Sequence, residues 1–326
     1  MGRLRAAVVG AGYLGRFHAM KYKDLPGVDL VGVADIDAHR ADEVAKELGA
    51  RAYAGHRDLI GLVDVATVAV PTTDHYAVAS QLVAAGIHVL VEKPIAATLS
   101  EATSLVEAAE RQGVVLQVGH LERFNPTVQA LRRRLREPLF WECHRISPFP
   151  GRGGDVDVVL DLMIHDIDLI LDILDASVTQ VDAVGVPVLT SRYDIVNARI
   201  KFATGCVANL TASRVSAKSL RKIRVFQSDS YLSADSAKGE LIEYRRLPPE
   251  GPGAAPKITA QRVDVEERDS LMEEVRSFVE AVSSHAVPVV DGKAGVRALE
   301  VALKVIEGIR QSASGVDGGD LVRGLR

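Results

Sequence analysis

The sequence has little of what marks several specialised classes of protein. It contains two cysteines in 326 residues, Cys143 and Cys206, which lie far apart and in no metal-ligand spacing. No apolar run approaches the roughly 20 residues that span a bilayer. The glycine-interrupted start A-A-V-V-G-A-G is not a signal peptide. Since free thiols are typical of a reducing compartment, we expect a cytoplasmic protein.

The sequence also lacks a strong charge of either sign. Its formal net charge is −4 at pH 7, with 43 acidic and 39 basic residues. A chain of this balance is not expected to bind nucleic acid or an anionic membrane. The apolar fraction of 47% and the charged fraction of 25% are those of an ordinary globular protein, long enough for two domains.

Strand-like and helical patterns alternate in the first part of the chain. Short apolar runs predict strands at 4–9, 28–34, 63–70, 87–91 and 114–118. Between them lie helical patterns, including 35–48, 75–85 and 100–112, the last with Ser100 as its N-cap. This alternation predicts an α/β domain with a Rossmann-type, doubly wound parallel sheet over residues 1–122.

After Gly119 the pattern changes. Helices are expected at 126–136, 156–174, 266–284 and 292–311. Between 178 and 244 apolar and polar residues alternate, which predicts an open, mainly antiparallel sheet, with Thr204-Gly205 as a hairpin turn. Residues 247–256 are predicted to form a loop. We therefore expect a second domain over 123–326, of α+β type, whose final helices can pack back on the first domain.

The segment G-A-G-Y-L-G at 10–15 follows a strand and opens a helix, the context of a dinucleotide-binding turn. Gly10 permits the tight turn, Gly12 lets a pyrophosphate approach the backbone, and Gly15 allows close packing of helix on strand. Asp35 ends the second strand, 20 residues after Gly15, and can accept hydrogen bonds from a ribose diol. Because that carboxylate repels a 2′-phosphate, it favours NAD over NADP. Two alternatives stay open: Asp35 can cap a helix, and Asp37 can share the ribose.

Two further strand ends carry candidate site residues. Glu92-Lys93-Pro94 follows the fourth strand, at the edge where open α/β sheets bind ligands. Lys93 can stabilise a developing alkoxide, or it can be an ordinary surface lysine. Val70-Pro71-Thr72 ends the third strand, where it can line a cofactor or form a plain turn, and His75 begins the next helix, where its alternative role is capping. The predicted cofactor-binding residues are Gly10, Gly12, Tyr13, Leu14, Gly15, Asp35, Pro71, Thr72, His75, Glu92 and Lys93.

A polar stripe runs along the helix expected at 156–174. Asp161, His165, Asp168 and Asp172 are spaced four, three and four apart, so they fall on one face of a regular helix that is otherwise mostly apolar. Burying such groups is costly unless they meet partners or line a cleft, which makes this face a candidate wall of an active site. The alternative is a polar helix edge in contact with water. His165 can accept a hydroxyl proton, with Asp161 orienting its ring.

Other candidate substrate contacts are scattered. Arg123 and Asn125 follow the fifth strand in G-H-L-E-R-F-N-P, and Arg145 and Arg152 flank the polar helix. An arginine suits a phosphate partner. The predicted substrate-binding residues are Lys93, Arg123, Asn125, Arg152, Asp161 and His165. No metal is expected, because oxidation of an alcohol by a nicotinamide needs none.

Together, Gly10-x-Gly12-x-x-Gly15, Glu92-Lys93-Pro94 and Asp161-x-x-x-His165-x-x-Asp168 resemble the Gfo/Idh/MocA oxidoreductase family over essentially the whole chain. The resemblance implies a nicotinamide-binding Rossmann domain and a C-terminal domain whose open sheet makes a homo-oligomer, dimer or tetramer. It also implies Lys93 and His165 as the catalytic pair, with Asp161 assisting. Met163 stands where members of this family often have glycine.

Within the family, the stretches around 119–126 and 155–169 are similar to enzymes that oxidise C3 of a UDP-sugar such as UDP-N-acetylglucosamine, on the route to lipid A. We therefore expect NAD-dependent oxidation of a sugar hydroxyl to a ketone. Two alternatives stay open, a dehydrogenase of a free sugar or inositol-type polyol, and an NAD-sensing regulatory protein without catalysis.

Overall fold

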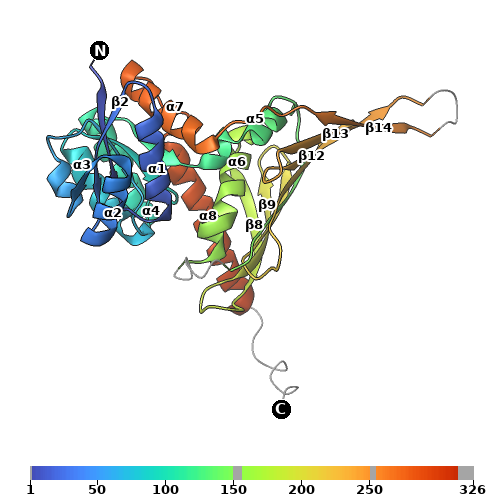
Figure 1. Cartoon of the computed structure of the whole chain (residues 1–326). Helices are drawn as coiled ribbons and strands as arrows, with labels where there is room; N and C mark the ends of the chain where they lie inside the picture. Colours follow the sequence, from blue (N-terminus) through green and yellow to red (C-terminus); the bar gives the residue numbers. More distant parts are fainter. Residues whose placement is uncertain (1, 150–155, 250–254, 315–326) are drawn as a thin grey trace. The chain divides into compact units, whose positions relative to one another are not determined.

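The structure is a computed structural model that describes residues 2–149, 156–249 and 255–314 (Figure 1). Its internal contacts divide the chain into two units. Unit 1 comprises residues 1–126 and 267–299, and unit 2 comprises residues 127–266 and 300–326. None of the described helices is long and apolar enough to cross a membrane.

Unit 1 is built on a six-stranded parallel sheet. The strands are β1 (Leu4–Val9), β2 (Val28–Ala34), β3 (Arg51–Tyr53), β4 (Val65–Val68), β5 (His88–Glu92) and β6 (Leu116–Gly119). Their order is β3-β2-β1-β4-β5-β6, so the direction of winding reverses between β1 and β4. The predicted Rossmann-type doubly wound sheet is confirmed.

Two strands of this sheet differ from the prediction. β3 has three residues, too few to leave a recognisable apolar run. β4 covers Val65–Val68 rather than 63–70. After Val68 the chain leads into the short 3₁₀ helix η2 (Thr72–Asp74). The Val70 carbonyl oxygen, just before this helix, lies 2.9 Å from Nε2 of His75 and pairs with none of the described strands.

The helices of unit 1 cover both faces of its sheet. They are α1 (Tyr13–Asp24), α2 (Ala38–Leu48), α3 (His75–Ala84), α4 (Leu99–Gln112) and α7 (Ser270–Ser284), with 3₁₀ turns η1 (His56–Leu59) and η3 (Leu121–Phe124). α1 contacts α2, and α3 contacts α4, the pairing expected of a doubly wound sheet. The N-cap of α4 is Thr98, not Ser100: the Thr98 hydroxyl accepts from Glu101 N–H, and the Glu101 carboxylate accepts from Thr98 N–H.

α7 comes from the far end of the sequence and completes the core of unit 1. Val275, Phe278 and Val282 on this helix are buried in one cluster with Ala19 and Tyr22 of α1. The apolar residues of α7 (Ser270–Ser284) recur at helical spacing and so lie on one face of the helix. That face packs against α1 and is buried.

Unit 2 is built on an eight-stranded sheet. The strands are β7 (Phe140–Ile146), β8 (Val178–Val186), β9 (Ile195–Phe202), β10 (Val207–Ser213), β11 (Leu220–Phe226), β12 (Ser230–Asp235), β13 (Glu240–Leu247) and β14 (Lys257–Val263). Their order is β14-β13-β12-β11-β7-β10-β9-β8. Only the β7–β10 pair is parallel among these strands, so the predicted mainly antiparallel sheet is confirmed. Gly205, with φ +84°, forms the predicted β9–β10 turn.

The helices of unit 2 are α5 (Pro126–Arg132), a π-helical turn η4 (Val159–Met163), α6 (Ile164–Leu174) and the second part of α8 (Gly292–Ser314). α6 and α8 lie on one side of the sheet (Figure 1). α5 ends four residues earlier than predicted, and beyond it the Arg136 N–H donates to the Gln227 side chain at 2.7 Å. Most of the loop predicted at 247–256, and the tail after 314, lie outside the described residues.

Candidate cofactor site and catalytic groups

The glycine-rich turn has the geometry that its sequence predicts. Gly10 has φ +97°, and a Cβ there would lie 2.5 Å from the Ala69 carbonyl oxygen. A Cβ on Gly15 would lie 1.7 Å from the Gly10 carbonyl oxygen, so only glycine permits this contact of helix and turn. By contrast, a Cβ on Gly12 would meet no described atom within 4 Å. The open side of the turn is thus at Gly12, where α1 begins and its N–H groups can bind a phosphate.

Asp35 supports this turn from the end of β2. Its carboxylate is 8% exposed and accepts from Ala11 N–H at 2.7 Å and from Asp37 N–H at 2.8 Å. Since a carboxylate offers about four lone-pair positions, it keeps acceptor capacity for a ribose diol. Asp37, not Asp35, is the N-cap of α2, accepting from His39 and Arg40 N–H. The residues present fit a dinucleotide whose phosphates lie at Gly12 and whose ribose lies at Asp35.

His75 is placed differently from the prediction. It is 1% exposed, and its ring nitrogens lie 2.8 Å from the Pro94 carbonyl oxygen and 2.9 Å from the Val70 carbonyl oxygen. Burial lowers the pKa of His75, although both backbone oxygens act to raise it. Both ring nitrogens of His75 therefore face backbone oxygens, and its predicted contact with a cofactor stays a prediction. His75 instead joins the loops that follow β4 and β5, and these loops carry exposed Pro71 and half-buried Thr72.

Glu92 and Lys93 lie at the carboxyl end of β5. Glu92 Oε2 accepts from the Lys93 N–H at 3.2 Å, and Oε1 lies 2.8 Å from Nε2 of His18. Burial alone would raise the pKa of Glu92, but the hydrogen bond and charge of His18, with Lys93 nearby, lower it below its usual value. Glu92 is therefore an anion that fixes the backbone of Lys93. The Lys93 residue itself is half-buried.

The predicted polar helix does not start as a regular α-helix. Residues Val159–Met163 form a π-helical turn in which the Ile164 N–H reaches the Val159 carbonyl. Asp161 lies in this wider turn and His165 in the first turn of α6, so the direction of Asp161 differs from that in an ideal helix. Both residues are half-buried. π-helical turns of this kind are frequent at functional sites.

The other polar groups of this helix have structural partners. Asp166, 3% exposed, forms a two-pronged ion pair with Arg145, 4% exposed, at 2.7 Å. Asp172 pairs with Arg132. Arg145 is thereby withdrawn from the candidate phosphate partners, since its guanidinium is buried and neutralised inside unit 2.

Of the remaining substrate candidates, Arg123 donates to the Val289 carbonyl oxygen at 3.4 Å and Asn125 ends η3. Both are half-buried. Arg152 lies outside the described residues. Lys93 belongs to unit 1, whereas Asp161 and His165 belong to unit 2, so their predicted convergence on one substrate stays a prediction.

Sequence reasoning missed two groups at this edge. His18 and Glu274 are both fully buried beside Glu92. The available signal was a histidine and a glutamate on the otherwise apolar faces of two helices. Ile36, next to Asp35, was also missed; it is apolar and 98% exposed.

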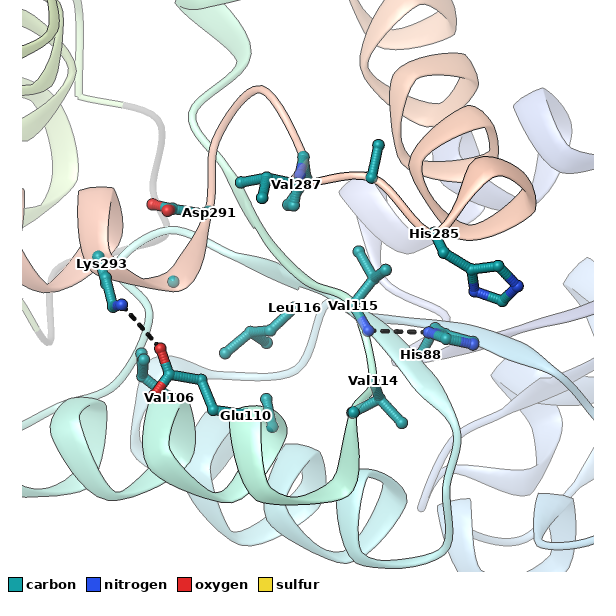
Figure 2. Close-up of a pocket in the computed structure, with 15 residues that line it drawn as sticks. His88, Val106, Glu110, Val114, Val115, Leu116, His285, Val287, Asp291 and Lys293 are labelled. Atoms are coloured by element: carbon teal, nitrogen blue, oxygen red, sulfur yellow. Dashed lines mark hydrogen bonds and ion pairs between the residues drawn. The ribbon is translucent and has the colours of Figure 1, made fainter.

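Unit 1 has a separate cavity of about 310 Å³, at the amino ends of β5 and β6 (Figure 2). His88, Leu116 and His285 line it, and an ion pair between Lys293 and Glu110 lies at one end. None of the predicted site residues that the structure describes lines it. It lies at the strand ends opposite to those that carry Asp35 and Lys93, so it is distinct from the candidate cofactor site.

Two family models match the chain. One, described as an oxidoreductase family with an NAD-binding Rossmann fold, matches residues 4–120, and the other, described as the GFO/IDH/MocA C-terminal domain, matches residues 142–232. The chain belongs to the Gfo/Idh/MocA family of NAD-binding oxidoreductases.

Several relatives refine this assignment. UDP-N-acetylglucosamine 3-dehydrogenase from Acidithiobacillus ferrooxidans is 40% identical over 93% of this chain and 96% of its own. A solved structure of that enzyme, GnnA, has a TM-score of 0.90, with 39% identity, covering 95% of this chain and 99% of that one. An inositol 2-dehydrogenase from Acidothermus cellulolyticus is 33% identical over 56% of each chain.

Proposed function

We propose that this protein is an NAD-dependent dehydrogenase that oxidises the C3 hydroxyl of a UDP-sugar, such as UDP-N-acetylglucosamine, to a ketone. The observation that carries the proposal is the turn open at Gly12 with Asp35 beside it, in a chain that is similar over nearly its whole length to an enzyme of that activity. NAD, when bound there, would supply the two-electron oxidant.

The residues of this chain would bind and orient both molecules. The N–H groups at the start of α1 would hold the diphosphate, Asp35 the ribose, and Ile36 the adenine face. Tyr13 and Leu14, 58% and 43% exposed, would cover the cofactor from the first turn of α1. The loops joined by His75 would shape the space beyond, with Pro71 and Thr72 along it.

His165 would accept the proton of the sugar hydroxyl, and Asp161 would orient its ring. Lys93, fixed through its backbone by Glu92, would stabilise the negative charge developing on the same oxygen. Arg123, Asn125 and Arg152 would contact the nucleotide part of the substrate. A neutral imidazole is required before the proton moves, so activity should fall at acidic pH.

The charge of Asp35 supports NAD rather than NADP, because a 2′-phosphate would lie against an anion. We further propose a cytoplasmic homo-oligomer, dimer or tetramer, assembled through the sheet of unit 2. The stacked, half-exposed rings of Phe140, Phe226, Tyr231 and Tyr244 on four neighbouring strands support this, with centroid distances of 5.7, 5.2 and 4.3 Å. The keto product suits an aminotransferase on a route to lipid A.

A panel of alcohols tests the function. The purified protein with NAD is offered UDP-N-acetylglucosamine, other UDP-sugars, free sugars and inositols, and reduced cofactor is followed by absorbance. We expect turnover with a UDP-sugar and competition by UDP. Turnover only with inositol would favour the alternative function, a polyol dehydrogenase. The 33% identity to an inositol 2-dehydrogenase supports testing this alternative. Binding of NAD without turnover of any alcohol would favour an NAD sensor.

His165→Ala tests the proposed base. We expect turnover to fall by about a hundredfold or more while NAD binding is retained, because proton transfer by a positioned base contributes on this scale. The matched control is His144→Ala, a half-exposed histidine on β7 without a proposed role in catalysis. Equal turnover by the two variants would remove His165 from the mechanism.

A further inference from the structure

Three titratable side chains meet in the interior of unit 1, beneath the candidate cofactor site. His18 on α1, Glu92 at the end of β5 and Glu274 on α7 offer atoms that lie within 4.8 Å of one another. His18 and Glu274 are 0% exposed, and only Glu92 reaches the surface, with 11% of its side chain exposed. The cluster is thus buried, and its one solvent-exposed member is Glu92, the residue that precedes Lys93.

The hydrogen bonds of this cluster are unequal. Both Glu92 oxygens are used, one by His18 and the other by the Lys93 N–H. Among the residues that the structure describes, neither carboxyl oxygen of Glu274 has a hydrogen-bond partner, and Nδ1 of His18 has none either. An ionised carboxylate buried without a donor is among the least stable arrangements in a protein. Glu274 therefore needs a neutralising proton or cation.

The groups around Glu274 favour neutralisation by a proton rather than by a cation. The anionic Glu92 has a carboxyl oxygen within 4.8 Å of a carboxyl oxygen of Glu274, and the hydroxyl of Tyr22 on α1 is hydrogen-bonded to Thr67 at 2.9 Å. Burial first, and then the charge of Glu92, raise the pKa of Glu274 well above its usual value. The other titratable groups around Glu92 are His18, His75 and Lys93. No described side chain donates a hydrogen bond to the Glu274 carboxyl, so a bound proton is what would leave this buried group uncharged.

We propose that Glu274 carries a proton in the folded protein and is a positioning residue, whose O–H donates into the Glu92–His18 pair and so holds the carboxylate that fixes the backbone of Lys93. Since neither Glu274 oxygen has a direct partner among the described residues, the 4.8 Å limit admits this hydrogen bond through a single buried water. α7 thereby reaches from the end of the sequence to the Glu92-Lys93 strand end. The role of Lys93 rests on the proposed function, whereas the protonation of Glu274 does not.

The protonation is tested without substrate. In the full-length protein labelled with ¹³C at glutamate carboxyls, we expect one resonance to keep the chemical shift of a protonated acid at pH 7. Glu274→Gln should remove that resonance and no other. If every glutamate carboxyl titrates in the ordinary acidic range, the proposal is overturned. A divalent cation bound in stoichiometric amount by the purified protein and lost in Glu274→Gln would overturn it too.

The positioning role is tested by a pair of variants. Glu274→Gln keeps a neutral hydrogen-bond donor. Glu274→Leu removes the donor and also removes the free-energy cost of burying a polar group. We expect Glu274→Leu to melt no lower than Glu274→Gln, yet to lose about tenfold in kcat/KM, since small displacements near the reacting groups are costly. Glu274→Gln should stay within about threefold of the natural protein.

A purely structural role predicts that activity and melting temperature fall together in these two variants, and this outcome would overturn the positioning role. If no alcohol is oxidised by any form of the protein, the proposed function fails, but the carboxyl resonance still decides the protonation of Glu274.

Discussion

At the scale of single residues, burial decides which polar side chains are available for chemistry. Asp166 and Arg145 carry the right groups for a site, but they neutralise each other inside unit 2. His75 carries an imidazole, but the ring is enclosed by two backbone carbonyls. Asp35 keeps acceptor capacity because backbone donors occupy only part of its carboxylate.

Asp35→Asn should shift the choice of cofactor. The variant keeps an oxygen acceptor for Ala11 N–H but removes the charge that repels a 2′-phosphate. We expect the ratio of kcat/KM for NADP to that for NAD to rise about tenfold. Asp37→Asn, which affects the cap of α2, is the control. An equal ratio in the two variants would show that the Asp35 charge does not select the cofactor.

Asp194 is a buried residue whose ionisation affects the stability of unit 2. It is 0% exposed and accepts from the N–H groups of Val188, Leu189 and Thr190, and from Arg214 Nε at 2.7 Å. Burial acts to raise the pKa of Asp194, but these donors hold it well below its usual range. Arg214, 1% exposed, also donates to the Val156 carbonyl oxygen, just before η4.

The lowered pKa gives a pH dependence of definite sign. The stabilisation by Asp194 is complete above its unfolded-state pKa of about 4 and is lost as the pH falls toward the folded-state value. Asp194→Asn should therefore lower the free energy of unfolding at pH 7 by about 3 kcal/mol, because it leaves Arg214 buried without its counter-ion. Urea unfolding at pH 7 and pH 3 measures this. The gap between variant and natural protein should narrow at pH 3; a constant gap contradicts the assignment.

At the scale of elements, strand and helix patterns are read well from sequence, and some of their ends are too, whereas the ends of β4 and α5 are not. The predicted helices at 75–85 and 100–112 correspond to α3 and α4 within one residue at each end. The π-helical turn before α6 was not predictable, because one extra residue per turn does not change the spacing of polar residues visibly when most residues of the segment are apolar. Neither was the short β3, which is stabilised by pairing with β2 rather than by its own sequence.

Thr98→Ala should destabilise unit 1 through α4. The Thr98 hydroxyl accepts the Glu101 N–H in the capping box, so its removal should cost about 1 kcal/mol in the free energy of unfolding, while the backbone N–H of residue 98 can still donate to the Glu101 carboxylate. The control is Ser100→Ala, at the position that the sequence pattern favours as N-cap but that lies inside the helix. Chemical denaturation of both variants checks this. A larger loss for Ser100→Ala would place the cap where the sequence alone puts it.

At the scale of the whole molecule, the chain builds unit 1 from two separated segments. Val275, Phe278 and Val282 of α7 lie in the core formed by β1 and α1. At about 2 kcal/mol for each buried side chain, they contribute about 6 kcal/mol, comparable with the stability of a whole domain. Residues 1–126 have the full parallel sheet but lack this contribution.

We therefore expect residues 1–126 alone not to fold cooperatively. The same residues joined through a Gly/Ser linker to 267–299 should fold and should be stabilised by NAD, as binding to the folded state requires. Thermal unfolding followed by circular dichroism, with and without NAD, checks both forms. Cooperative unfolding of residues 1–126 alone would show that α7 is not required.

The sequence by itself determined the class of fold, the glycine turn, Asp35 and the Glu92-Lys93-Pro94 strand end, because each depends on neighbours within one strand–turn–helix unit. Only the tertiary structure decided that His75 and Arg145 are buried, that Asp161 lies in a π-helical turn, and that Glu274 meets Glu92. The physical reason is that ionisation and burial depend on groups far apart in the chain: 182 residues separate Glu92 from Glu274, and no local pattern records their meeting.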